Sequence, residues 1–326
     1  MKTLMAWILA AGLSSTAVAD TALPPFADRV EALAFSTGLT SAQRRDRIVA
    51  LYRAEFRGPL ATRDVDALRH RLDGALTAAF YSKDRAVARD AATLHRALAA
   101  QGALRRDDTD HVLASLIKAR AFEQADQLAR AYGKPALPPV IRAPRPLLKR
   151  GPRVIVVDDG RLTIRPAERR PFHDGVVVVS SPSCRFSSAA AAAIARDPAL
   201  RAALHGSLWL VPPEGQLRAR EVRQWNLDHA GQQMVLAYDW LEWPDIDDWS
   251  TPAFYFFAGG HLVDQVSGWP LDGRGMPQLR RAVAAWREAG GAPAARASAA
   301  SPRAEVDRHA ETRLEIGAVP VQAEVE

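Results

Sequence analysis

The chain has 326 residues, 48% apolar and 25% charged, which is typical of a globular protein long enough for about two domains. Its formal net charge of +6 is carried mostly by arginine. No array of basic and aromatic residues like that of a nucleic-acid module is present, so we predict no nucleic-acid partner and attribute the charge to an arginine-favouring proteome. A nucleic-acid or acidic-membrane partner is the alternative interpretation of the charge.

The first 19 residues have the three parts of a secretory signal peptide. Lys2 supplies a positive start, residues 4–13 are apolar, and Ala17 and Ala19 fit the small-residue cleavage pattern. The sequence therefore predicts a signal peptide at 1–19 and a periplasmic mature protein. The apolar segment is too short for a stable membrane span, and no later segment is long and apolar enough for one.

Residues 20–134 are predicted to form a helical domain. The segment "TSAQRRDRIVALYRAEF" begins with Thr40 as a helix cap and places Ile48, Tyr52 and Phe56 on one face. No fixed repeat period is present, so the pattern indicates an α-helical bundle or an irregular solenoid. Similar helical patterns occur at 62–80, 84–100, 107–120 and 121–133.

Two further segments lack regular periodicity. Residues 135–152 are rich in proline and arginine, which predicts a linker or an extended arm laid against a domain. Residues 290–326 are rich in alanine, proline and charge, and we expect a disordered tail there.

Residues 153–289 alternate strand and helix patterns, which indicates an α/β sheet. A first hairpin turns at Asp159 and Gly160, and a second is joined at Gly259 and Gly260. The chain is thus predicted to be a two-domain α+β protein, a helical domain followed by an α/β domain. The predicted elements are hairpins at 154–166 and 253–269, strands at 176–181, 207–213 and 233–239, and helices at 187–197, 217–231 and 276–290.

Cys184 is the only cysteine, and it lies between a predicted strand and an alanine-rich helix. The unpaired N–H groups and partial positive charge of a helix N-terminus stabilise a thiolate and lower the pKa of a cysteine there. Arg185 adds a nearby cation. Because cysteines of exported proteins normally pair, a single one is either a buried inert thiol or a reactive one.

Three segments, "VVVVSSPSCRFS", "STPAFYFFAGG" and "HLVDQVSGW", resemble those of the thioredoxin-like superfamily, in its exported thiol–disulfide oxidoreductase type. The resemblance covers about residues 153–289. It implies a thioredoxin-like domain with Cys184 as the nucleophile and a cis bond between Thr251 and Pro252. It also implies that Thr251, Pro252 and Phe186 contact the substrate, since Pro252 leaves an open backbone edge that pairs with a substrate peptide in the family.

The chain departs from the family at Ser187, which replaces the second cysteine and gives a C-x-x-S site. Cys184 can then form a mixed disulfide but cannot expel its partner unaided. We therefore predict monothiol thiol–disulfide exchange, with Ser187 and Arg185 stabilising the thiolate. The expected partners are protein thiols or disulfides and an external resolving thiol. The alternative hypothesis is a redox-inactive, thioredoxin-like interaction module in a periplasmic assembly, in which Cys184 is a remnant.

The remaining candidate residues carry weaker signals. His173, His205, His229 and His261 lack the spacing of a metal site, so we predict neither a metal nor a cofactor. The segment "DWLEWPDIDDW", at 239–249, offers carboxylates and tryptophans for an acid/base pair or an aromatic lip. We favour a loop whose tryptophans fill the core beside Pro252.

Overall fold

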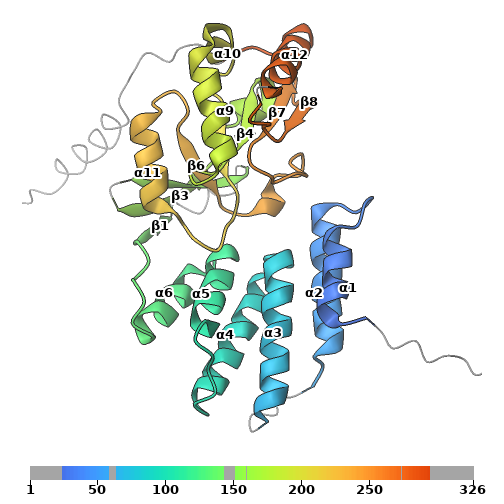
Figure 1. Cartoon of the computed structure of the whole chain (residues 1–326), viewed down its shortest axis with the longest axis vertical. Helices are drawn as coiled ribbons and strands as arrows, with labels where there is room; N and C mark the ends of the chain where they lie inside the picture. The colour runs from blue at the N-terminus through green and yellow to red at the C-terminus, as the bar shows by residue number, and fades with distance from the viewer. Residues whose placement is uncertain (1–23, 59–63, 143–150, 159, 273, 294–326) are drawn as a thin grey trace, which may run out of the picture.

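The computed structural model describes residues 24–58, 64–142, 151–158, 160–272 and 274–293. The predicted signal peptide and residues 294–326 of the predicted tail lie outside these ranges. Within them the chain is a mixed α/β protein with eleven α-helices and one eight-stranded sheet. Six of the helices precede the main strands, as predicted (Figure 1). Among the described helices, none is long and apolar enough to cross a membrane.

The first six helices form a layer that is held together by small and aliphatic side chains. Ala75, Ala78 and Ala79 of α3 and Ala88 of α4 are fully buried, which lets these two helices pack closely. Thr40 caps α2 through a reciprocal pair of hydrogen bonds with Gln43, as its position in the sequence predicts. The helices are α1 (Phe26–Ala34), α2 (Ser41–Glu55), α3 (Val65–Ser82), α4 (Arg85–Ala99), α5 (Asp108–Lys118) and α6 (Phe122–Ala131).

The sheet has the strand order β1-β3-β2-β6-β5-β4-β7-β8. Its centre is parallel (β4, β5 and β6), and antiparallel pairs flank it on both sides. Both predicted hairpins are confirmed, β2 with β3 and β7 with β8. Gly259 and Gly260 have φ angles of 58° and 80°, which the tight turn between β7 and β8 requires. The strands are β1 (Val140–Arg142), β2 (Arg153–Asp158), β3 (Arg161–Pro166), β4 (Val176–Val179), β5 (Leu208–Val211), β6 (Met234–Ala237), β7 (Ala253–Ala258) and β8 (His261–Ser267).

Part of the predicted linker is a strand. Residues 140–142 form β1, which pairs in parallel with β3 at the edge of the sheet. Leu162 N–H also donates to the Pro139 carbonyl oxygen at 2.9 Å. The proline-rich composition fits an edge strand, where a missing N–H costs no ladder bond. Residues 143–150 lie outside the described part of the chain.

The two faces of the sheet are covered differently. Side chains alternate along β4, so that Val176 and Val178 pack on one side, while Val177 and Val179 pack on the other. Helices α9 (Arg185–Arg196), α10 (Pro198–Ala203), α11 (Ala219–Asp228) and α12 (Gly275–Glu288) contribute to the core of the first face. Short α8 (Arg170–Asp174) and the segment after β6 cover the second. Trp243 and Ile246 of that segment are buried there, as predicted for a loop that fills the core.

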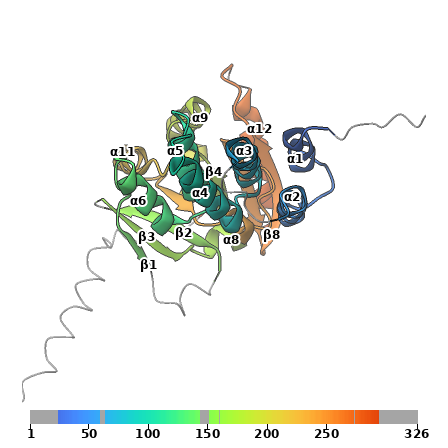
Figure 2. The same cartoon turned by 90° about the horizontal axis from the view of Figure 1, so that it is seen from below.

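The helical layer packs against the edge of the sheet where the three parallel strands end (Figure 1). Arg120, which is buried, donates to the carbonyl oxygens of Ala237, the last residue of β6, and of Tyr238, the residue after it. Burial lowers the pKa of Arg120 to about 10. The Arg85 guanidinium reaches the Tyr238 hydroxyl at 3.1 Å, and the Lys83 ammonium lies 3.8 Å from the ring centre of Trp240. Seen from below, the helices of this layer lie across the sheet (Figure 2).

Candidate thiol site

Cys184 is the residue directly before α9, and a tight turn carries the chain to it from β4. Cys184 N–H donates to the Ser181 carbonyl oxygen at 3.1 Å, which closes the turn. Ser188 N–H then donates to the Cys184 carbonyl oxygen at 3.0 Å, which is the first hydrogen bond of the helix. Cys184 thus occupies the N-cap position, where the unpaired N–H groups of the helix begin.

The start of β7 brings a second backbone segment to the sulfur. β7 runs antiparallel to β4, with Ala253 opposite Val179, so the residues before β7 lie beside the turn after β4. The bond between Thr251 and Pro252 is cis, as predicted. The Cys184 thiol donates to the Thr251 carbonyl oxygen across 3.2 Å. The predicted proximity of the cysteine to this segment is therefore confirmed.

The pKa of Cys184 reflects opposing influences. Burial of the thiol raises its pKa, because a thiolate loses hydration. Hydrogen bonds from the side chain of Thr251, from the N–H and hydroxyl of Ser187, and from the N–H of Phe186 lower it. The Thr251 carbonyl oxygen favours the neutral thiol, whereas these donors favour the thiolate. The net result is a pKa below the ordinary value for cysteine.

Some of the other predicted site residues lie at the sulfur, and one, Arg185, is directed elsewhere. Ser187 is fully buried, and its hydroxyl accepts a 3.4 Å hydrogen bond from the Ser181 N–H, which ties α9 to the turn. Arg185 is exposed, and its guanidinium lies 4.7 Å from the ring centre of Phe186. The structure therefore gathers Ser187, Phe186 and Thr251 at the sulfur and turns Arg185 toward an aromatic ring.

Residues that the sequence did not single out also shape the site. Ser180, directly after β4, is buried, and its hydroxyl has no hydrogen-bond partner among the described residues. Pro182, in the turn, borders a cavity of about 410 Å³ with Trp225 and His229, whose rings stack with centres 4.0 Å apart. A serine after a strand and a tryptophan on a helix are ordinary features, so no local signal identifies them.

The chemistry available here is that of a single nucleophilic sulfur. The thiolate form is favoured by donors that the fold holds in place, and open space adjoins the turn. The sequence contains no second cysteine to form an intramolecular disulfide. Within the described ranges, no three histidine, cysteine, aspartate or glutamate side chains are grouped so that they could hold a metal ion.

His173 instead pairs with Asp174 at 2.6 Å, and His229 stacks on Trp225. These histidines therefore have partners within the protein.

Comparisons of the chain with protein-family models, with curated proteins and with solved structures find no match.

Proposed function

We propose that this protein is an exported, periplasmic, thioredoxin-like protein that carries out monothiol thiol–disulfide exchange through Cys184. The observation that carries the proposal is the set of hydrogen-bond donors around the sulfur, which lower the pKa of Cys184. A lower pKa raises the fraction of thiolate at neutral pH, and the thiolate is the reactive form. The cis bond before Pro252 and the succession β4, α9, β5, α11, β6, β7, β8, α12 support the thioredoxin-like assignment.

The proposed reaction begins when the Cys184 thiolate attacks one sulfur of a partner disulfide. The partner S–S bond breaks, its electron pair leaves with the other sulfur as a thiolate, and a new disulfide joins Cys184 to the partner. Ser187 stands where a resolving thiol would be needed, and its hydroxyl does not attack sulfur at neutral pH. An external thiol therefore has to attack the mixed disulfide and regenerate the Cys184 thiolate.

A substrate peptide is proposed to lie along Thr251 and Pro252. Pro252 has no N–H, and its carbonyl oxygen already accepts a hydrogen bond from Gly268 at 2.8 Å. The carbonyl oxygen of Thr251 lies beside the sulfur, so a chain extended along Thr251 would present its disulfide to Cys184. Phe186 is half-buried next to the sulfur and offers an apolar contact to that chain.

The direct test is the rate of Cys184 alkylation as a function of pH. The folded protein and the same protein unfolded in urea are compared, so that the unfolded chain supplies the reference thiol. We expect the midpoint of the folded protein to lie at lower pH, and Cys184→Ser to take up no label. Equal midpoints would refute the proposal and favour the redox-inactive interaction module.

A second test uses the missing resolving thiol. Reaction with a small aromatic disulfide should give an adduct, seen by intact mass, that persists until an external thiol is added. Ser187→Cys should shorten its lifetime, because a thiol at this buried position can attack the mixed disulfide at high effective concentration. Ser188→Cys is the matched control, since that side chain is exposed and bonds the Cys184 carbonyl rather than the sulfur. If Ser187→Cys gives no faster release than Ser188→Cys, the geometry is not that of a thiol–disulfide site.

A further inference from the structure

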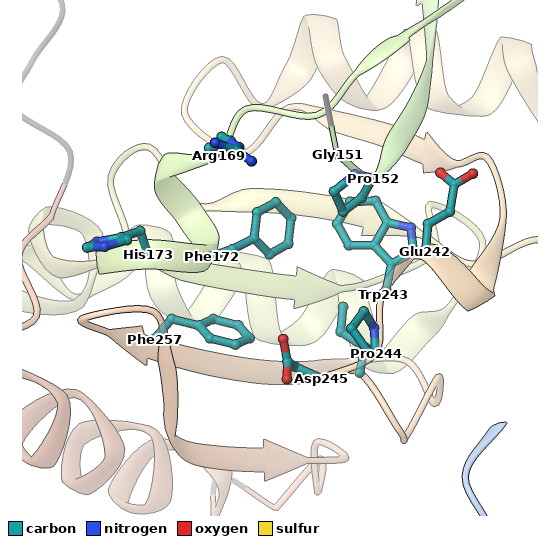
Figure 3. Close-up of a pocket in the computed structure, with 11 residues that line it drawn as sticks. Gly151, Pro152, Arg169, Phe172, His173, Glu242, Trp243, Pro244, Asp245 and Phe257 are labelled. Carbon is teal, nitrogen blue, oxygen red and sulfur yellow. The ribbon is translucent and has the colours of Figure 1, made fainter. Parts of the chain in front are cut away.

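A second cavity, of about 400 Å³, lies on the face of the sheet opposite α9–α12 (Figure 3). It opens between α8, which supplies Phe172, and the segment that supplies Trp243 and Asp245, with Phe257 of β7 as its floor. Its volume is in the range of small-ligand sites, which start near about 300 Å³. It shares no lining residue with the thiol site.

Three aromatic rings form the apolar walls of this aromatic pocket. The ring centres of Phe172 and Trp243 are 4.9 Å apart, and those of Phe172 and Phe257 are 6.2 Å apart. Trp243 and Phe257 are almost wholly buried, so the sheet and the loop hold their rings in place. Such rings present electron-rich faces that attract a cation as well as apolar groups.

One carboxylate, that of Asp245, lines this pocket without a partner in the protein and is exposed to solvent. Figure 3 shows the Asp245 carboxylate directed toward the space between the rings. Within the described ranges, Asp245 makes no hydrogen bond or ion pair. Glu242, also on the wall, differs because its carboxylate is bound by the backbone N–H and guanidinium of Arg153. Asp245 is therefore the carboxylate of the pocket that has no hydrogen-bond or ion-pair partner among the described residues.

The opposite rim carries a guanidinium, that of Arg169, and the imidazole of His173. Arg169 lies at the start of α8, and His173 is bound to Asp174 at 2.6 Å. In Figure 3 both lie across the pocket from Asp245. The charged groups of the pocket therefore lie at its ends, with the carboxylate of Asp245 at one end and the guanidinium of Arg169 toward the other. A ligand anion would be repelled at the Asp245 end, and a neutral apolar ligand would remove water from Asp245 without replacing it.

We propose that this pocket binds an organic cation, an ammonium or guanidinium group carried on an apolar body. The charged group pairs with Asp245, and the apolar body lies among the rings of Phe172, Trp243 and Phe257. Such a group occurs both in free amines and in the arginine or lysine side chains of peptides. Both sources present the same charged group on an apolar body. They differ in size, because a peptide side chain brings a flanking backbone that the pocket has to accommodate.

The test uses titration calorimetry on the full-length protein. The probes are 2-phenylethylamine, the neutral 2-phenylethanol of nearly the same shape, and an arginine residue blocked within Ac-Ala-Arg-Ala amide. We expect the amine to bind at least about tenfold more tightly than the alcohol, because only the amine pairs with Asp245. Binding of the amine alone assigns a small-molecule ligand, and binding of the peptide assigns a basic side chain.

Asp245→Asn removes the charge while keeping the shape of the side chain. Because Asp245 is exposed and unpaired, the variant should fold normally and lose at least about tenfold in affinity for the cation. Asp46→Asn, at an exposed aspartate of the helical layer, is the matched control and should bind as the original protein does. The proposal is overturned if the amine and the alcohol bind equally, if neither cation binds, or if Asp245→Asn binds the amine as tightly as Asp46→Asn does.

Discussion

The thiol site and the aromatic pocket are built in different ways. At the thiol site, donors from two backbone segments meet at one sulfur atom, and the pairing of β4 with β7 fixes their positions. In the aromatic pocket, three rings and one carboxylate leave a space of about 400 Å³, because a short helix and a loop cover this face of the sheet incompletely. The first arrangement selects a protonation state, whereas the second selects the size and charge of a ligand.

Strand β7 contributes to both sites, but at opposite ends. Its start lies beside Cys184, and Phe257 near its end forms part of the pocket. Phe257 lies five positions along the chain from Pro252, which is about 17 Å in an extended strand. No lining residue is shared. We therefore expect that substitutions at one site leave the other unchanged, and the following experiments test this independence.

The largest effect is expected from Trp243→Ala, which removes one wall of the pocket. Cation binding should fall below detection, and the free energy of unfolding should decrease by about 3–5 kcal/mol, as for other buried tryptophans. The midpoint of Cys184 alkylation should not move. Titration calorimetry, urea denaturation and the alkylation profile measure the three quantities. Phe80→Ala, at a largely exposed ring of the helical layer, is the control for loss of an aromatic side chain.

A smaller effect, confined to the other site, is expected from Ser187→Ala. Its hydroxyl is one of the donors that lower the pKa of Cys184, so its loss should move the alkylation midpoint to higher pH. Ser188→Ala is the control, because the Ser188 hydroxyl donates to the Cys184 carbonyl oxygen instead. Amine affinity should be equal in both variants. A midpoint that is the same in both would mean that the Ser187 hydroxyl does not stabilise the thiolate.

More of the thiol site than of the aromatic pocket could be predicted from the sequence. The strand before Cys184 and the Thr251–Pro252 segment are short continuous patterns, and their meeting follows once β4 and β7 are paired. Arg185 shows the limit of this reasoning, because the sequence gives the charge but not the rotamer that places it over Phe186. The orientation of a long side chain depends on its neighbours in space.

The pocket had no comparable local signal. Phe172, Trp243 and Phe257 come from three different segments, and only Trp243 belongs to a segment whose side chains were expected to fill the core. Whether such residues fill a core or leave a space depends on how α8 and the loop after β6 meet, which is set by tertiary packing. The packing of the helical layer on the sheet likewise depends on Arg120, which has a left-handed φ of 57° in a helix connection and has no sequence motif.

The smallest effect on both sites is expected from Lys83→Met, although it should change how stability depends on pH. Lys83 contacts Trp240, which lies three residues before Trp243 in the same segment. A change at Lys83 is therefore the change in the helical layer that lies nearest to the pocket wall along this segment. Burial lowers the pKa of Lys83 to about 7, with Lys118 as the next cause.

In the unfolded chain this lysine titrates near 10.5. Between about pH 7 and about pH 10.5 the unfolded state therefore binds the proton that the folded state has released, and the free energy of unfolding rises with pH. Below about pH 7 the folded protein holds a buried charge, and the cost of burying it is fully present. Lys83→Met removes this titration, so the stability of the variant relative to the original protein should be highest below about pH 7 and should decline toward pH 10.5.

Urea denaturation across this pH range measures the difference, in which contributions from titrating groups that do not interact with Lys83, such as Cys184, cancel. Lys134→Met, at a lysine paired with Asp110 on the surface of the helical layer, is the matched control and should leave the pH dependence unchanged. Parallel pH profiles for the original protein and Lys83→Met would contradict the assigned pKa. A change in amine affinity in Lys83→Met would instead show that the contact with Trp240 transmits the state of the helical layer to Trp243, and the two parts of the molecule would then be coupled rather than independent.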